Sequence, residues 1–346
     1  MNTYIIGEIG QNHNGSVDIA KLIVELISRP IIEETFNLDL KPMDAVKMTK
    51  RDLSEELTRS QMNRPYDNPN SFGKTYGEHR AFLELSDEQH YDVYKYAKSK
   101  GLDFIETLCS IGCLSLLKKF TPDKLKVASR DLTNLPLLRA LAETRIPMIL
   151  STGMAGKEEL DNAIETITKY HSDISILHCV SQYPTNPDHL NLNTILYLKE
   201  HYKQYKIGFS DHTIGIAAPT VAIGMGAEII EKHVTIDRRM KGTDQAGSLG
   251  PDGVNRMIRD IRLVERWLGR KELFIDSCVV DAKNKLERSI AANKHLKAGH
   301  IIREEDLCLL SPGDGYKWHE KDKLIGKRIK IAVDINELIY PDNIDE

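Results

Sequence analysis

Short apolar stretches alternate with longer amphipathic ones along most of this 346-residue sequence, and this alternation limits the possible folds more than any other feature. A short apolar run followed by helical periodicity indicates a strand with a helix packed on it, and repetition of the pair predicts a parallel sheet. Eight stretches have the character of strands: 4–9, 44–48, 103–107, 124–128, 148–150, 174–177, 206–209 and 228–231. Eight is the number of strands that closes a (β/α)8 barrel.

Helical periodicity occurs between and after these strands, at about 17–28, 87–100, 135–144, 157–170, 191–203, 215–226 and 252–268. An open, doubly wound sheet is the alternative fold, and it would place a glycine-rich dinucleotide turn after the first strand. The sequence at that point, GEIGQNHNG, has glycines at the wrong spacing for such a turn. We therefore predict the α/β class and a (β/α)8 TIM barrel.

Two irregular stretches interrupt the pattern. Residues 29–43 contain two prolines and mixed charges, which indicates an insertion before the second strand. Residues 51–85 are rich in Asn, Gly and Pro, and we predict that they form a long polar loop. Loops on the carboxyl side of barrel strands often carry lids and substrate contacts.

The periodicity changes after the last predicted helix, and short strand-like pieces replace the alternation. We predict a barrel domain over 1–272, a linker over 273–285 and a small β-rich domain over 286–346. The strand-like pieces of the small domain are RSIAANKHL, HIIREEDLCLL, KRIKIAVDI and ELIYPDNI. A domain of about 60 residues often depends on docking to something larger for its stability.

Charge and composition exclude several classes of function. The 47 basic and 51 acidic residues are interspersed, so the sequence shows no basic stripe and predicts no nucleic-acid partner. No window approaches the ~18 apolar residues of a membrane span, and the start, MNTYIIGEIG, lacks the pattern of a signal peptide. We expect a cytoplasmic protein. The five cysteines are scattered; a thiolate site at Cys109 and Cys113 would lack a second pair, which favours small buried hydrophobes.

Polar side chains follow the predicted strands, and the carboxyl ends of barrel strands converge on one face. The histidines His212 and His233 follow two neighbouring strands. Two imidazoles placed in this way can hold a divalent metal and leave positions open for substrate oxygens. Ordinary hydrogen-bonded core histidines are the alternative.

Two lysines, Lys47 and Lys126, are predicted to lie inside the barrel, where an amine is costly unless an anion or a carboxylate accompanies it. A salt bridge to Glu8, Glu106 or Asp131 would satisfy either amine. The presence of both lysines beside several serine and threonine hydroxyls favours a small dianionic ligand instead.

The motifs in this order resemble the sialic acid synthase family, the nonulosonate synthases that condense phosphoenolpyruvate with an aldose. The barrel motifs are IGEIGQNHNGS, DAVKMTK, KVAS with NLPLL, ILSTGM, HCVSQYP, IGFSDHT and EKHVTID. The segment RSIAANKHLKAGHIIREEDL with PGDG resembles the antifreeze-like (SAF) module of these enzymes. The resemblance covers nearly the whole chain.

The resemblance implies a role for each of a set of polar residues. Phosphoenolpyruvate would contact Lys47, Thr107, Lys126, Ser129, Ser151, Ser181 and Ser210. A divalent metal, Mn²⁺ or Mg²⁺, would be held by His212 and His233, and the sugar would lie near Glu8, Tyr183 and Asp244. The catalytic residues would be Glu8, Lys126, Asp131 and Asp244. The family also implies a domain-swapped homodimer.

The expected activity is the condensation of phosphoenolpyruvate with an open-chain aldose such as N-acetylmannosamine, giving N-acetylneuraminate and phosphate. A related synthase acting on another hexose, a metal-dependent sugar-phosphate aldolase or lyase, and a non-catalytic binder are the alternatives. Three positions depart from the family pattern. Ser311 replaces a common arginine, Thr49 a common glutamine, and Arg130 a glycine.

Overall fold

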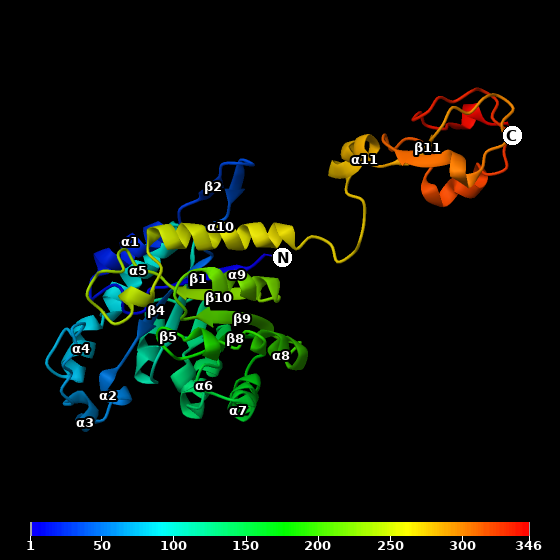
Figure 1. Cartoon of the computed structure of the whole chain (residues 1–346). Helices are drawn as coiled ribbons and strands as arrows, with labels where there is room; N and C mark the ends of the chain where they lie inside the picture. Colours follow the sequence, from blue (N-terminus) through cyan, green and yellow to red (C-terminus); the bar gives the residue numbers. More distant parts are fainter. Residues whose placement is uncertain (1, 346) are drawn as a thin grey trace. The chain divides into compact units, whose positions relative to one another are not determined.

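The computed structural model describes residues 2–345, and the chain divides into two units, Met1–Gly269 and Arg270–Glu346 (Figure 1). The first unit contains a closed barrel of eight strands. They are β1 (Tyr4–Glu8), β4 (Ala45–Lys50), β5 (Asp103–Leu108), β6 (Lys124–Val127), β7 (Met148–Ser151), β8 (Ile174–Cys179), β9 (Lys206–Asp211) and β10 (Ile229–His233). Every neighbouring pair is parallel, and β1 pairs with both β4 and β10 to close the ring. The predicted TIM barrel is confirmed.

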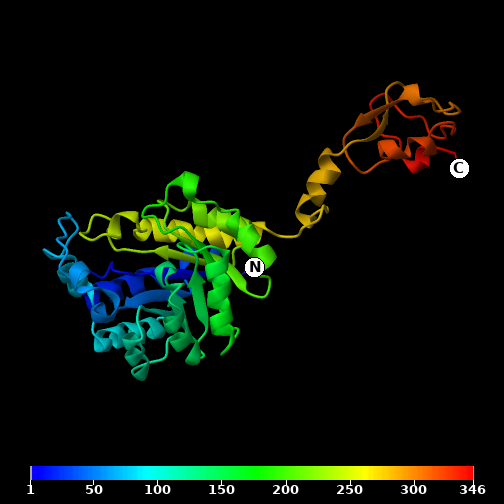
Figure 2. The same ribbon diagram turned by 90° about the horizontal axis from the view of Figure 1, so that it is seen from below.

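Seven helices lie outside the strands, at the places where the periodicity predicts them (Figures 1 and 2). They are α1 (Val17–Ile27), α5 (Asp87–Ser99), α6 (Leu135–Glu143), α7 (Lys157–Thr168), α8 (Thr194–His201), α9 (Ala217–Gly224) and α10 (Pro251–Trp267). Local signals set their starts: Ser86 and Gln89 form a capping box at α5, and Pro251 begins α10. Their apolar faces pack on the barrel and form the main core.

A separate apolar cluster fills the inside of the barrel. Its members are Ile6, Ala45, Ile105, Ile149, Leu177 and Ile229, one from each of six strands. Side chains along a strand point alternately to opposite faces, so these residues fix which alternate positions point inward. At Gly208 of β9, an added Cβ would meet the backbone oxygen of Ile229 at 2.4 Å, so the two strands leave no room there for a side chain.

The two irregular stretches contain more regular structure than the sequence predicts. The insertion at 29–43 forms an antiparallel hairpin of β2 (Ile31–Glu33) and β3 (Leu38–Leu40). The predicted loop at 51–85 contains α2 (Leu53–Glu56), α3 (Arg59–Met62) and α4 (Tyr76–Leu83). The prediction of a plain loop is therefore wrong for α4, which begins at a capping box of Thr75 and Glu78.

The second unit has its own small core, which includes Ile290, Leu296, Ile302, Leu324 and Ile339. Its strands β11 (Ser289–Ala292) and β12 (Leu307–Leu310) pair in antiparallel fashion. The two later strand-like pieces form isolated bridges rather than strands. A helix, α11 (Val280–Leu286), occupies part of the predicted linker.

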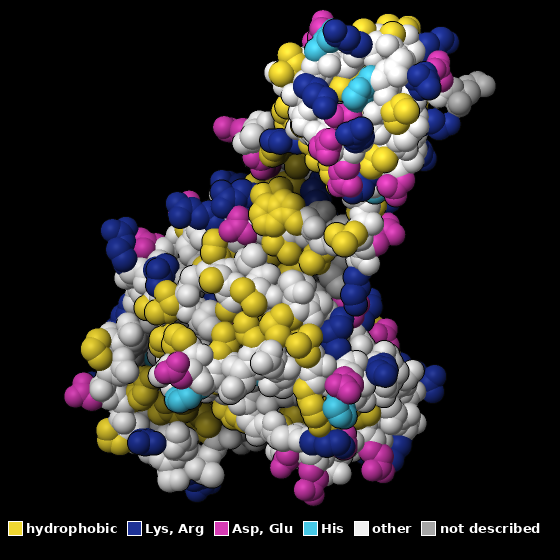
Figure 3. Space-filling model, turned by 45° about the vertical axis from the view of Figure 1, so that its right-hand side comes forward, with side chains coloured by type: hydrophobic (Ala, Val, Ile, Leu, Met, Phe, Trp, Pro, Cys, Tyr) yellow, Lys and Arg dark blue, Asp and Glu magenta, His cyan; other side chains and the backbone are white. Residues whose placement is uncertain are grey.

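Basic and acidic side chains are interspersed on the face shown in Figure 3. Among the residues that the structure describes, no helix has both the length and the apolar character needed to cross a bilayer.

Replacing Ile105 by alanine tests the packing of the barrel interior. Ile105 is fully buried in the interior cluster, so the Ile105→Ala variant is expected to lose about 2–5 kcal/mol of unfolding free energy. Urea unfolding followed by circular dichroism measures the loss. Leu22 on α1 is 57% exposed, and the control variant Leu22→Ala should change little. Equal effects of the two substitutions would contradict this packing.

Candidate functional site

The polar site begins in the next inward-pointing layer of side chains, on the carboxyl-end side of the apolar cluster inside the barrel. Two residues after each apolar member comes another side chain with the same inward direction. These second-layer residues are Glu8, Lys47, Thr107, Ser151, Cys179 and Glu231. The alternation that buries an apolar floor thus places a ring of polar groups directly above it.

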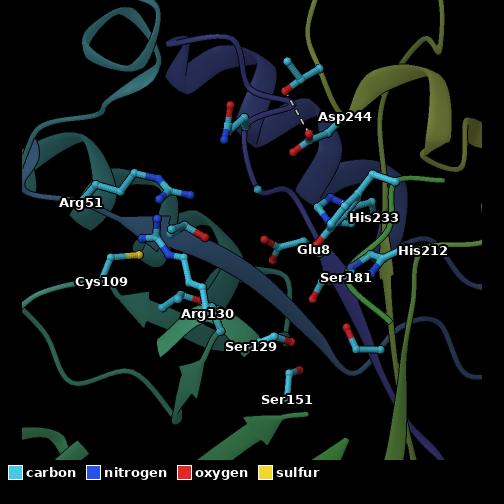
Figure 4. Close-up of a pocket in the computed structure, with 18 of the residues that line it drawn as sticks. Glu8, Arg51, Cys109, Ser129, Arg130, Ser151, Ser181, His212, His233 and Asp244 are labelled. Atoms are coloured by element: carbon cyan, nitrogen blue, oxygen red, sulfur yellow. Dashed lines mark hydrogen bonds between the residues drawn. The ribbon is translucent and has the colours of Figure 1, made fainter. Parts of the chain in front are cut away.

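These residues open into a cavity of about 570 Å³, part of which is drawn in Figure 4. All but one of the residues predicted for the site line it: Glu8, Lys47, Thr107, Lys126, Ser129, Ser151, Ser181, Tyr183, Ser210, His212, His233 and Asp244. The exception is Asp131. Its carboxylate accepts a hydrogen bond from Arg130 Nε at 3.2 Å and lines a neighbouring hollow instead.

A buried lysine and two buried carboxylates form the centre of the site. Lys47 Nζ lies 2.9 Å from Glu8 Oε2 and 3.5 Å from Glu231 Oε1. Burial raises the pKa of Glu8 to about 7, and repulsion from Glu231 acts in the same direction, while Lys47 opposes both. Burial also disfavours an ionised Glu231, but Lys47 and Lys126 outweigh it and lower its pKa to about 2. Glu8 is therefore suited to exchange a proton near neutral pH.

Glu231 is a functional candidate that the sequence analysis did not name. It lies in β10 two residues before His233, and therefore points inward as His233 does. Its carboxylate also accepts a hydrogen bond from Ser210 Oγ at 3.2 Å. The two-residue spacing from His233 was the signal that could have identified it.

Lys126 differs from Lys47 in having no carboxylate partner. Its amine donates to Ser151 Oγ at 2.6 Å and to the Val127 carbonyl at 2.9 Å. Within residues 2–345 no carboxylate oxygen lies within the 4.0 Å salt-bridge distance of this amine. Burial lowers the pKa of Lys126 because the charged form is desolvated. Of the two alternatives for the lysines, Lys47 thus has its salt bridges, whereas Lys126 is free to pair with an anion.

The two histidines have the character of metal ligands. His212 Nδ1 lies 2.9 Å from the Val180 carbonyl, and donation to that oxygen leaves the lone pair on Nε2 free. His233 Nδ1 is buried and has no hydrogen-bond partner among the described residues. The ring centroids are 5.6 Å apart. Burial lowers the pKa of both, that of His212 to about 4, so both imidazoles are neutral at pH 7, as metal ligation requires.

This donor set fits a divalent metal that is bound only partly by the protein. Within residues 2–345 no three His, Cys, Asp or Glu side chains gather closely enough to hold a metal by themselves. The remaining ligands would be oxygens of substrate or water. Tyr183 covers one face of the pair, with its ring centroid 3.9 Å from that of His212.

The cavity also has lining residues that the sequence analysis did not assign to the site. Arg51, Tyr66, Asn68, Asn70, Tyr76, His79 and Arg80 come from residues 51–85, and Arg130 follows β6. The expectation that residues 51–85 contribute to the site is therefore supported by their position.

Comparison with known proteins gives the family. A model described as "NeuB family" matches residues 40–273, and a model described as "SAF domain" matches residues 287–345. The chain belongs to the NeuB family. The resemblance noted from the motifs is thereby confirmed, and the second unit carries the SAF match.

Several similar proteins are named as synthases of a sialic or legionaminic acid product. The chain is 30% identical to human N-acetylneuraminate-9-phosphate synthase over 99% of the chain and 92% of the relative. It is 31% identical to N,N'-diacetyllegionaminic acid synthase of Legionella pneumophila over 100% of the chain and 95% of the relative. A crystal structure of N-acetylneuraminic acid synthetase from Leptospira borgpetersenii has a TM-score of 0.68 at 28% identity, covering 82% and 90% of the two chains.

Replacing Lys47 by methionine tests the central ion-pair cluster. The Lys47→Met variant leaves Glu8 and Glu231 facing each other without the amine that bridges them, which is expected to cost about 3–5 kcal/mol at pH 8. The loss should be smaller at pH 5, because the raised pKa of Glu8 then lets it become neutral.

Urea unfolding at the two pH values measures both effects. Lys95, whose side chain is 54% exposed in a pair with Asp92, supplies the control Lys95→Met, which should change stability little. A loss for Lys47→Met that does not depend on pH would show that the cluster is not held together as described.

Proposed function

We propose that this protein is a metal-dependent nonulosonic acid synthase that condenses phosphoenolpyruvate with an open-chain hexosamine and releases inorganic phosphate. The single observation that carries the proposal is Lys126. Its buried amine has no carboxylate partner and lies beside Ser151 in the cavity that His212 and His233 also line. A buried cation of this kind calls for an anionic ligand. The names of the relatives support a sugar-acid product.

The residues divide into two substrate regions within the one cavity. Lys126, with the hydroxyls of Ser129, Ser151 and Ser210, would bind the phosphate and carboxylate of phosphoenolpyruvate. His212 and His233 would hold Mn²⁺ or Mg²⁺, and such an ion supplies Lewis-acid polarisation of a carbonyl. The remaining predicted contacts to the sugar, Glu8, Tyr183 and Asp244, also line the cavity.

The chemistry follows from this division. A carbon–carbon bond forms between the methylene carbon of phosphoenolpyruvate and the aldehyde carbon, and the aldehyde oxygen takes up a proton. Water adds to the second carbon of the enol and gives up a proton, and phosphate leaves by cleavage of the C–O bond. Glu8 is the best placed group to move these protons, because its pKa lies near neutrality. Asp131, also a candidate, lines a neighbouring hollow instead, where it accepts a hydrogen bond from Arg130.

Lysines and hydroxyls hold the substrates while charge moves. Lys126 keeps two donors on fixed acceptors, Ser151 Oγ and the Val127 carbonyl. The amine is thus oriented before an anion arrives, which lowers the reorganisation that binding requires. Lys47, held by Glu8 and Glu231, maintains a positive charge near the developing alkoxide.

Phosphate release in the presence of phosphoenolpyruvate, Mn²⁺ and a panel of hexosamines tests the activity. Release should require phosphoenolpyruvate, an aldose and the metal, and a chelator should abolish it. An aldolase or lyase would instead cleave a keto sugar acid without phosphoenolpyruvate. A non-catalytic binder would release no phosphate with any sugar, and either result would overturn the proposal.

The His212→Ala variant tests the metal assignment. Removing one of two protein ligands should weaken Mn²⁺ binding at least about tenfold, as seen by calorimetry, and lower condensation in parallel. His201 on α8 is exposed, and His201→Ala serves as the control. Unchanged Mn²⁺ affinity in His212→Ala would remove that residue from the metal site.

The Lys126→Met variant tests the anion site without turnover. Because burial lowers the pKa of Lys126, a bound anion should raise it again and draw a proton onto the amine. Phosphoenolpyruvate binding at alkaline pH should therefore be accompanied by proton uptake. Calorimetry in buffers of different ionisation enthalpy measures this uptake. It should vanish in Lys126→Met and persist in the exposed control Lys157→Met; uptake that survives in Lys126→Met would place the anion elsewhere.

A further inference from the structure

Each of the two candidate metal-binding histidines directly follows a charged residue, and the two charges are opposite. Asp211 ends β9 and precedes His212, whereas Lys232 precedes His233 at the end of β10. The strand register pairs Lys232 with Asp211, so the two residues lie side by side on adjacent parallel strands. Because successive side chains of a strand point to opposite faces, this pair points out of the barrel where the histidines point in.

The preceding outward positions on these strands are apolar. One step before the pair, Phe209 of β9 lies beside Ile230 of β10, and both are fully buried in the main core between barrel and helices. The next outward position is charged on both strands and is still buried, because Asp211 and Lys232 are each 1% exposed. Apolar residues would continue the core without the cost of removing two charges from water. Packing alone therefore does not explain the pair.

Both members of the pair also hold the residue that follows His212. Lys232 Nζ lies 2.5 Å from Asp211 Oδ2 and also donates a hydrogen bond to the Thr213 carbonyl. Asp211 Oδ1 accepts a hydrogen bond from the Thr213 backbone N–H at 2.8 Å, and Oδ2 accepts one from the Thr213 hydroxyl at 3.2 Å. The two backbone polar groups of Thr213 are thus bound by the pair, one by each member.

These contacts connect the backbone segments that carry the two imidazoles. The strand β9 ends at Asp211, so His212 and Thr213 lie where the chain leaves the sheet. The amine of Lys232 binds this departing segment to β10 immediately before His233. The position of one histidine relative to the other therefore depends on the pair.

The pair lies behind the cavity wall and acts on a ligand only through its neighbours. The residues on either side of each member do line the cavity: Ser210, His212, Glu231 and His233. Two imidazoles ligate one ion only if their nitrogens fall within one coordination shell. The ring centroids of His212 and His233 are 5.6 Å apart, and this spacing is set by the positions of the two strand ends.

We propose that the Asp211–Lys232 ion pair is a positioning element that sets the spacing of His212 and His233, so that both imidazoles reach one divalent ion. This inference rests on the proposed function, because it takes the two histidines as metal ligands. A buried ion pair adds little stability over an apolar pair of similar size, and its value lies in selecting one arrangement of the chain. Here that arrangement is the alignment of two strand ends that each carry one ligand.

Neutralising the pair tests the proposal. The Asp211→Asn/Lys232→Met variant removes both charges together, so it leaves no uncompensated charge in the core and should fold. Its Kd for Mn²⁺, measured by calorimetry without substrates, should rise about 10- to 100-fold. Its Kd for phosphoenolpyruvate without metal should stay unchanged, because Lys126 and Ser151 belong to β6 and β7. The apolar pair Asp211→Leu/Lys232→Met continues the row of buried apolar residues and should give the same two results.

A second buried ion pair of the barrel supplies the matched control. Arg262 Nη2 lies 2.9 Å from Asp44 Oδ2, and the two side chains are 4% and 7% exposed. Asp44 directly precedes β4, at the amino ends of the strands and therefore at the end opposite the histidines. The Asp44→Asn/Arg262→Met variant should unfold at lower urea concentration and keep the wild-type Kd for Mn²⁺. An equal rise of that Kd in both neutralised variants would show general loosening of the barrel and overturn the inference.

Combination with His212→Ala shows whether the pair acts through the spacing of the histidines. Once one imidazole is removed, that spacing no longer matters, so neutralising the pair in the His212→Ala background should leave the Kd for Mn²⁺ where His212→Ala alone sets it. Fully additive losses of affinity would show that the pair acts on the metal by another route, and this too would overturn the inference.

The same measurements separate this inference from the proposed function. If Mn²⁺ binds the wild-type protein and His212→Ala weakens that binding, an unchanged Kd in Asp211→Asn/Lys232→Met overturns the positioning role alone and leaves the proposed function standing. If the wild-type protein binds no Mn²⁺, or if His212→Ala binds it equally well, the metal assignment of the proposed function is wrong and the inference fails with it.

Discussion

Three ionisable side chains, Lys47, Glu8 and Glu231, meet in the layer directly above the apolar floor of the barrel. Removing such groups from water costs several kcal/mol for each ion, and only their mutual attraction offsets this cost. The cluster is possible because three different strands place inward-pointing residues at the same height. The pKa values of the two carboxylates are shifted in opposite directions. Glu231 therefore keeps a negative charge, whereas Glu8 can gain or lose a proton near neutral pH.

Around this centre the cavity is divided by electrostatic character. The neutral imidazoles of His212 and His233 offer lone pairs, and the amine of Lys126 offers a positive charge without a counter-charge. The guanidinium groups of Arg51 and Arg130 lie on the opposite side. A sugar aldehyde beside the two histidines and an enol phosphate beside Lys126 would therefore each find a separate region. This separation is what a two-substrate condensation requires, because the reacting carbons meet only if each substrate is held by its own groups.

The strands and helices of the barrel could be predicted because each strand is a short apolar run and each helix shows its own period. The site residues that follow strand ends could also be predicted, since parallel strands bring their carboxyl ends together. The hairpin at 31–40 was missed because its strands are only three residues long, too short for a periodic signal. Glu231 was missed although it lies two residues before His233 on the inward face of β10. Asp131 follows β6 but lines a neighbouring hollow, where it contacts Arg130. Contacts of this kind between side chains leave no periodic trace in the sequence.

A crystal structure of the protein with Mn²⁺, phosphoenolpyruvate and a reduced hexosamine tests the central claim most directly. We predict the metal on His212 and His233, and the phosphate of phosphoenolpyruvate within hydrogen-bond distance of Lys126 Nζ. Phosphoenolpyruvate bound away from Lys126, or a metal bound away from both histidines, would contradict the account.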